Sequence, residues 1–190
     1  MPPKPKITKE MIIDAAVAVI RQEGFECVNA RTVSQELHCS TQPVMYHFAT
    51  IEELKHTVYA QVDHLHTEYL MHCAPGQDPI LGIGLNYIRF AVEEPQLFRF
   101  LFQSGYAEEG SLLEMIDSAE LAPVLVAMQE GTGLDRERTR EVFLTVALFA
   151  HGYASIIANN HLEYDEELIA KHLEHTWNGA LREAAQEECV

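Results

Sequence analysis

The stretch NARTVSQELHCSTQPVMYHF, residues 29–48, decides the fold, because it encodes two short helices with almost no chain between them. Asn29 is a favourable cap for a first helix over about 30–37, and Val33 and Leu37 are spaced as neighbours on its inward face. Ser40 is placed to cap a second helix over 41–47. Only residues 38–40 are left for the turn.

The second short helix has an inward pair of its own, Val44 and Phe48, which are again four residues apart. Pro43 fits its first turn, where a backbone N–H has no intrahelical partner to lose. Two short helices joined by a three-residue turn are typical of a helix-turn-helix, whose second helix enters the major groove of DNA.

The helix before this motif is predicted by its ends. Thr8 caps a helix over about 8–23. Gly24 supplies the left-handed residue that ends it, and Phe25 is placed to fold back on Ile20 as the apolar contact of a Schellman stop.

From residue 50 onward the apolar residues keep helical spacing. Thr50 and Glu53 form the T-x-x-E pattern of a capping box, which opens a helix to about residue 73. A further helix must stop before Pro95, and long helices begin near Asp135 and Asp165. The chain is predicted to be all-α with about nine helices, divided into a helix-turn-helix domain over 1–52 and a helical bundle over 53–190.

The charge of the chain is unevenly divided. Asp and Glu outnumber Lys and Arg by 29 to 13, a net charge of −16. Residues 1–55 hold six basic and seven acidic residues, so nearly all of the negative charge falls after residue 55. This balance argues against a protein that coats nucleic acid unspecifically, and repulsion would keep the acidic part off DNA.

Composition also bears on location and chemistry. The four cysteines include no C-x-x-C pair, which favours free thiols in a reducing compartment, and we expect a cytoplasmic protein. Uninterrupted apolar stretches fall well short of the roughly 20 residues that span a bilayer, so no membrane partner is expected. No nucleophile elbow, Walker loop, G-x-G-x-x-G or H-E-x-x-H motif occurs, and we expect neither catalysis nor a cofactor.

The outward residues of the second short helix suit contact with DNA. Gln42 can pair with adenine through two hydrogen bonds, Thr41 can reach a phosphate or a thymine methyl, and Tyr46 can reach a phosphate oxygen. Any one of them could instead belong to an ordinary exposed helix face, and Arg31 could be a surface ion-pair partner. The predicted DNA contacts are Lys9, Arg31, Thr32, Ser40, Thr41, Gln42, Pro43, Tyr46 and His47.

Residues 8–54 resemble the DNA-binding domain of the TetR family of bacterial transcriptional regulators. The shared features are A-A at 15–16, E-G-F at 23–25, R-T-V at 31–33 and Y-H-F at 46–48. FAVEEPQLFRFLF (90–102) and ALFAHGYASIIANN (147–160) resemble one C-terminal class of these regulators. The resemblance implies a helical homodimer whose N-terminal domains bind a palindromic operator in double-stranded DNA and whose C-terminal domain binds a small-molecule effector.

Two positions depart from the family pattern. His38 stands where members commonly have Gly, and a left-handed backbone suits His less well than Gly. Ile51 stands where many members have a Lys that contacts phosphate, so that contact is missing. We therefore expect DNA binding to need two half-sites, about 34–36 Å apart, presented together by a dimer.

Residue types in the C-terminal part suggest an effector pocket and a dimer face. Aromatic and Met residues can line an adaptable apolar cavity or fill the core; the candidates are Tyr87, Phe90, Phe102, Met115 and Met128. Small residues on one helix, together with apolar residues on the last, can form a four-helix interface across a twofold axis or a core within one subunit; these are Ala147, Ala154, Ala158, Ile169, Leu173, Trp177 and Leu181.

The ten histidines raise the alternative of metal binding. His64, Glu68 and His72 share one helix face, as do His172 and His175, but two turns separate His64 from His72, which is too far for all three to bind one ion. We expect no metal site. The leading hypothesis is a repressor that an effector releases from its operator; the alternative is a helical small-molecule or metal-binding protein with weakened or lost DNA binding.

Overall fold

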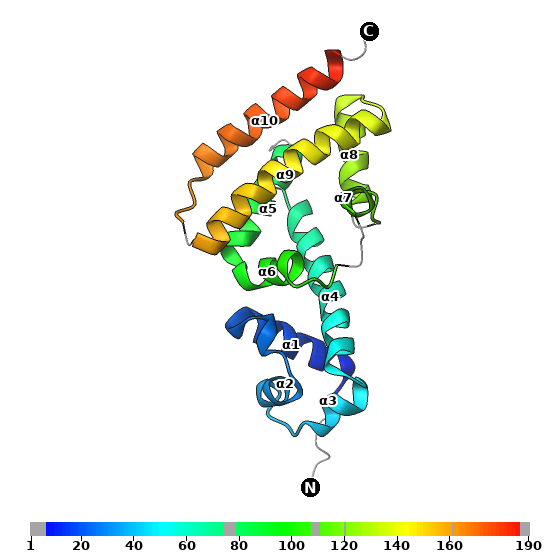
Figure 1. Ribbon diagram of the computed structural model, residues 1–190, viewed down its shortest axis with the longest axis vertical. Coiled ribbons are helices and arrows are strands. Elements are labelled where there is room, and N and C mark those ends of the chain that lie inside the picture. Colours follow the sequence, from blue (N-terminus) through cyan, green and yellow to red (C-terminus); the bar gives the residue numbers. More distant parts are fainter. Residues whose placement is uncertain (1–6, 74–78, 108–110, 120, 161, 187–190) are drawn as a thin grey trace. The chain divides into compact units, whose positions relative to one another are not determined.

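The computed structural model describes residues 7–73, 79–107, 111–119, 121–160 and 162–186, and every regular element in these ranges is helical (Figure 1), which confirms the predicted all-α class. In chain order the helices are α1 (Lys9–Glu23), the 3₁₀-helix η1 (Phe25–Cys27), α2 (Ala30–Glu36), α3 (Gln42–His47), α4 (Ile51–Met71), α5 (Pro79–Glu93), α6 (Pro95–Gln103), α7 (Leu112–Ile116), α8 (Ala122–Thr132), α9 (Arg136–Asn160) and α10 (Glu166–Gln186).

The chain forms two compact units. The first consists of Met1–Leu65 with Glu94–Ala107, and the second of His66–Glu93 with Glu108–Val190. In the first unit α1 packs against α2 and α6, so a helix distant in sequence completes the support of the helix-turn-helix. In the second, α9 packs against α5, α8 and α10.

The structure confirms the predicted start of α1 but not the predicted form of its end. Thr8 Oγ1 accepts a hydrogen bond from Met11 N–H at 3.3 Å, which confirms the predicted cap. The predicted Schellman stop is wrong, because Gly24 has φ 94° and ψ 161°, outside the left-handed helical region. The chain continues instead into η1, and Phe25 packs its ring on Phe100, with ring centroids 5.7 Å apart.

The interior of the first unit confirms three of the four inward residues predicted for the helix-turn-helix. Val33, Val44 and Phe48 are fully buried, whereas Leu37 is only half-buried. The apolar α6 contributes four more buried side chains: Leu97, Phe98, Phe100 and Leu101.

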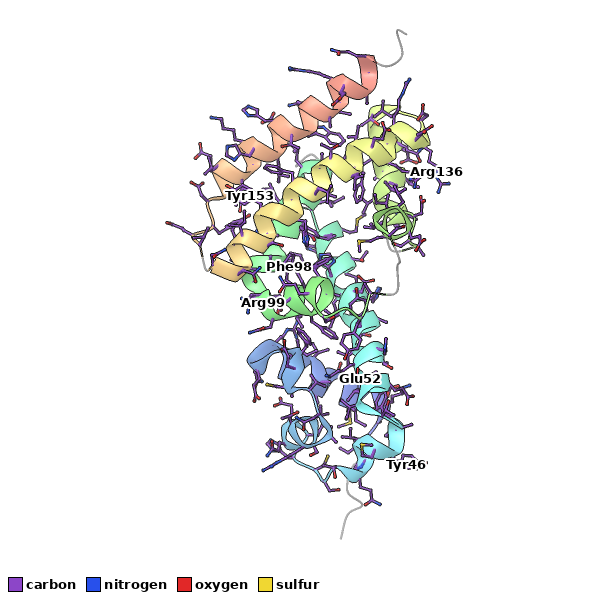
Figure 2. All side chains as sticks on the ribbon, viewed as in Figure 1. Tyr46, Glu52, Phe98, Arg99, Arg136 and Tyr153 are labelled. Carbon is purple, nitrogen blue, oxygen red and sulfur yellow. The ribbon has the colours of Figure 1, made fainter. Side chains whose placement is uncertain are left out.

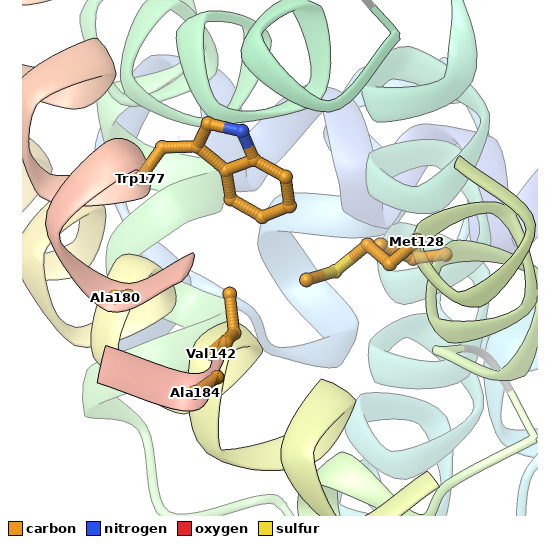
Figure 3. Close-up of a cluster of buried hydrophobic side chains, with 6 residues drawn as sticks. Met128, Val142, Trp177, Ala180 and Ala184 are labelled. Carbon is orange, nitrogen blue, oxygen red and sulfur yellow. The ribbon is translucent and has the colours of Figure 1, made fainter. Parts of the chain in front are cut away.

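The interior of the second unit holds three long helices together. A Cβ at Gly84 would lie 3.3 Å from Leu173 Cδ2, so the glycine allows α5 and α10 to approach closely. A buried cluster joins α8, α9 and α10 through Met128, Val142 and Trp177 (Figure 3). These side chains fix the relative positions of the helices that carry them.

One buried amide ends α4. Asn86 Nδ2 donates to the backbone oxygens of Leu70 at 3.1 Å and His72 at 3.2 Å, and lies 3.4 Å from that of Tyr69. The last carbonyls of a helix have no intrahelical partner, and here a side chain from α5 satisfies them.

Helix α9 is long and apolar enough, by length and composition alone, to cross a membrane. Only 28% of its most apolar stretch is buried. A core helix of a soluble protein meets the same criterion, and α9 packs against three helices of its own unit. Its exposed apolar residues nevertheless need a physical explanation.

His66 lies in the interior of the second unit with 6% of its surface exposed. Its ring packs edge-on against Tyr87 and Phe90, with centroids 5.4 and 4.8 Å away. Burial disfavours the imidazolium and lowers the pKa of His66 to about 4. Between this pH and 6.5 the unfolded chain binds a proton at His66 that the folded protein does not.

The free energy of unfolding should therefore fall as the pH falls from 6.5 to 4, with a contribution from His66 of about 3 kcal/mol. His66→Phe keeps a ring but cannot titrate. We therefore expect its free energy of unfolding to fall by about 3 kcal/mol less than that of the wild type over this pH range. Urea unfolding at a series of pH values measures the difference. Equal losses in wild type and His66→Phe would contradict the assignment.

Candidate nucleic-acid interface

A complete capping box begins α2. Asn29 Oδ1 accepts hydrogen bonds from the N–H groups of Arg31 at 2.9 Å and Thr32 at 3.1 Å, and Thr32 Oγ1 accepts one from Asn29 N–H at 3.1 Å. The Thr32 hydroxyl also donates to Cys27 O at 2.7 Å. Thr32, a predicted DNA contact, thus has a structural role in starting the helix.

The turn after α2 has the hydrogen bonds of a Schellman motif. His38 N–H donates to Gln35 O at 3.0 Å, and Cys39 N–H donates to Ser34 O at 2.9 Å. The motif requires a left-handed residue at its centre, and His38 occupies that place with φ 50°. His38 is the only residue other than glycine with positive φ in the described part of the chain.

Helix α3 begins one residue later than predicted. Its cap is Thr41, which already has helical backbone angles and makes no side-chain capping bond, so the predicted cap at Ser40 is wrong. Pro43 lies in the first turn as expected. The buried Val44 and Phe48 hold this short helix against the first unit.

The outer face of α3 is exposed. Tyr46 extends from the helix with 81% of its surface accessible (Figure 2), and Thr41 and Gln42 are also exposed. Met45 is 46% exposed and was missed by the sequence analysis. Met45 could have been predicted to point outward, because it directly follows the inward Val44 and neighbouring residues of a helix do not share a face.

Two predicted contacts have partners inside the protein. The half-buried His47 places Nε2 3.1 Å from Ile7 O, and so ties α3 to the segment before α1. Lys9 Nζ lies 4.9 Å from the centre of the Phe48 ring, so the ammonium group makes a cation–π contact within the protein. Lys4 and Lys6, which we expect to form a loose basic arm together with Lys9, lie outside the described residues.

The charge around this face is low. The segment 37–48 contains no Asp or Glu, and no described carboxylate pairs with the exposed guanidinium of Arg31. Ile51 is the first residue of α4, and the two carboxylates after it have partners inside the protein. Tyr106 O–H donates to Glu52 at 2.6 Å, and Ala49 N–H donates to Glu53 at 2.8 Å.

The family described as "Tetracyclin repressor-like, C-terminal domain" matches residues 80–177, more than half of the chain. The protein belongs to the TetR family. The match lies outside the helix-turn-helix, so it is independent of the motif residues quoted from 8–54. The α2–α3 face is the candidate DNA interface of this chain.

Solved TetR-family structures share the fold. A Streptomyces coelicolor A3 member is 21% identical over 88% of this chain and 96% of its own, with a TM-score of 0.57. Another regulator from Streptomyces coelicolor reaches a TM-score of 0.70 at 13% identity, covering 94% and 88% of the two chains. The multidrug binding protein EbrR, complexed with imidazole, has a TM-score of 0.55 at 20% identity, covering 92% and 95%. No curated protein matches the chain significantly.

The residues predicted to form an effector pocket do not share one cavity. Phe90 and Met128 are buried at 2% exposure, and Met115 is half-buried. Phe102 belongs to the first unit, whereas the others belong to the second. Tyr87 O–H lies 2.8 Å from His151 Nδ1, and burial raises the pKa of its phenol. A cavity of about 780 Å³ in the second unit is lined by none of the five.

Most of the predicted dimer face lies inside the subunit, which is the alternative left open above. Buried at 7% exposure or less are Ala154, Ala158, Ile169, Leu173 and Trp177. Ala147 and Leu181 are half-buried. These side chains build the interior of the second unit, and the exposed apolar residues of α9 lie on a neighbouring face.

The histidine sets considered for metal binding form no such site in the described residues, where no group of three His, Cys, Asp or Glu is placed to hold an ion.

The strained turn at His38 yields a stability prediction. A residue with a Cβ in the left-handed region is disfavoured by about 1–2 kcal/mol. Replacing it with Gly removes this cost, but part of the gain is lost because Gly gives up more conformational entropy on folding. We expect His38→Gly to raise the free energy of unfolding by about 0.5–1 kcal/mol in urea titration. His38→Ala is the matched control and should be no more stable than the wild type. A His38→Gly protein of lower stability would contradict the strain.

Proposed function

We propose that this TetR-family protein is a cytoplasmic repressor that binds a palindromic operator through residues 1–52, with 53–190 binding an effector and forming the dimer. The observation that carries the proposal is the outer face of α3, where Gln42, Met45 and Tyr46 are exposed together beside a tight turn. In a helix-turn-helix, the outward side chains of the second helix are the ones that contact base edges in the major groove.

The chemistry of this face suits sequence-specific binding. Gln42 can bond an adenine edge, Met45 can contact a thymine methyl, and Tyr46 can reach a phosphate. Arg31 adds an exposed cation at the start of α2, which can pair with a phosphate. The second unit, with six basic and 20 acidic residues, is repelled by DNA, so contact is confined to the first unit.

Release by an effector follows from linkage. A ligand that binds more tightly to a conformation in which the two α3 helices cannot enter successive grooves will lower the affinity for DNA. The fold shared with a multidrug binding protein supports this role for the second unit, as does the 780 Å³ cavity there.

An exposed apolar stripe on α9, distinct from the alanine-rich face predicted from the sequence, supports dimerisation through this helix. Leu148 and Ile156 are 50% and 55% exposed, and Gly152 lies midway between them with open space where a Cβ would stand. The spacing of four residues puts all three on one face. A second copy of this helix can approach closely over Gly152 and cover both apolar side chains.

Selection from a random duplex library at rising salt tests DNA binding. We expect a palindromic site to be retained, and Gln42→Ala to relax preference at one base position per half-site, a loss of about 1–3 kcal/mol at the preferred site. Arg31→Ala should weaken all sites alike and reduce the salt slope by about 1 for each subunit.

Gln35→Ala, an exposed glutamine on α2, is the matched control and should keep the parent's preferences. Retention that ignores sequence at every salt concentration would reject the repressor and favour a protein that has lost operator binding. An unchanged profile for Gln42→Ala would reject the assigned role of that residue.

Charge placed on the outward stripe of α9 should separate the subunits. We expect Leu148→Glu to sediment as a monomer at concentrations at which the wild type is dimeric, because the two carboxylates would be buried facing an apolar partner. Val126→Glu, which alters an equally exposed apolar residue on α8, should remain dimeric. A dimeric Leu148→Glu protein, or a monomeric wild type, would exclude this interface.

A further inference from the structure

The cavity of about 780 Å³ lies where the start of α5 meets the carboxyl ends of α8 and α10. Its wall is mainly apolar and includes Ile80, Ala127, Leu134, Trp177 and Leu181. Its volume falls within the range of small-molecule sites. All of these residues belong to the second unit.

Trp177 gives the cavity an aromatic wall. Its indole is only 7% exposed and packs in the buried cluster with Met128 and Val142 (Figure 3). The same ring also lines the cavity, so a ligand there meets an aromatic surface already held in place. A fixed ring loses little conformational freedom when a ligand binds.

The charge of the lining has one sign. Among the described residues that line the wall, Glu130 is the only ionisable one, and no described base pairs with its exposed carboxylate. The Thr132 hydroxyl is already used, because it donates to Met128 O at 2.7 Å and accepts from Leu134 N–H at 3.3 Å. An anionic ligand would find a carboxylate and no cation among these lining residues.

We propose that this cavity binds apolar monocations, such as an alkyl amine or alkyl quaternary ammonium, with the chain against Trp177 and Leu181 and the cationic group at Glu130. A carboxylate attracts the charge, and an aromatic face accepts either a cation or its apolar substituents. That such a ligand is the effector rests on the proposed function; binding itself does not.

Three ten-carbon probes test the ligand class: decyltrimethylammonium below its micellar concentration, decanol and decanoate. Trp177 is the only tryptophan, so its fluorescence reports directly on the cavity. We expect saturable binding of the cation, with decanoate bound at least about fivefold more weakly, the factor for unit charges about 4 Å apart in water. Equal affinity for all three probes would overturn the proposal.

Variants locate the site. Glu130→Gln should weaken decyltrimethylammonium about fivefold and leave decanol unchanged, whereas Glu137→Gln, an exposed acidic residue outside the lining, should change neither. Ala127→Phe should occupy part of the cavity and weaken the binding of decyltrimethylammonium. Should Ala127→Phe fold poorly, as circular dichroism would reveal, Ala127→Leu serves the same purpose. Undiminished binding in the variant that folds would overturn the site.

A separate experiment tests the effector role: it measures whether the cation dissociates the protein from the operator selected from the duplex library. Dissociation of the complex by decyltrimethylammonium in the wild type, at concentrations that leave the complex of the Ala127→Phe variant intact, supports it. Binding of the cation without loss of operator affinity overturns the effector role alone, and absence of operator binding without any ligand overturns the proposed function instead.

Discussion

The turn between α2 and α3 is the constraint on which the candidate DNA interface depends. Two backbone hydrogen bonds close it, from His38 to Gln35 and from Cys39 to Ser34. The chain then has a single residue, Ser40, before the cap of α3. So short a connection leaves α3 little freedom, and the buried Val44 and Phe48 remove what remains. The outward direction of Gln42 and Tyr46 follows from this geometry.

The structure explains how an acidic protein can present a surface suited to DNA. The acids are not evenly spread: most follow residue 55, and the segment 37–48 holds none. The two that begin α4 have partners inside the protein, Glu52 the Tyr106 hydroxyl and Glu53 the backbone N–H of Ala49. Burial and the bond to Glu52 raise the pKa of Tyr106 to about 12. The negative charge around α3 is therefore smaller than the net charge of the chain suggests, and steering by long-range attraction is modest.

Local signals in the sequence predicted the helices well and their contacts less well. The caps at Thr8 and Asn29 were readable because each bond spans three residues or fewer. The conformation at Gly24 could not be predicted in the same way, because Phe25 packs on Phe100, a residue far along the chain. Helix α9 shows the limit most clearly. Its alanines and its exposed Leu148 and Ile156 form adjoining stripes, and contact with α5 and α10 decides which stripe is buried.

The same reasoning applies to the functional residues. Gln42 and Tyr46 could be placed on an outward face because a six-residue helix with two inward anchors leaves few alternatives. The cavity residues come from three helices that are distant in the sequence, and no local pattern brings Glu130 and Trp177 together. Aromatic residues such as Phe90 were attractive candidates by type alone, but tertiary packing placed them in the interior.

Helix α4 is secured at both ends. Thr50 Oγ1 accepts a hydrogen bond from Glu53 N–H at 3.0 Å at its start, and Asn86 bonds its last carbonyls. A helix frays from its ends, and side-chain hydrogen bonds oppose fraying at both ends here. Since α4 contributes residues to both compact units, the chain passes between them through one continuous helix whose first and last turns are both held.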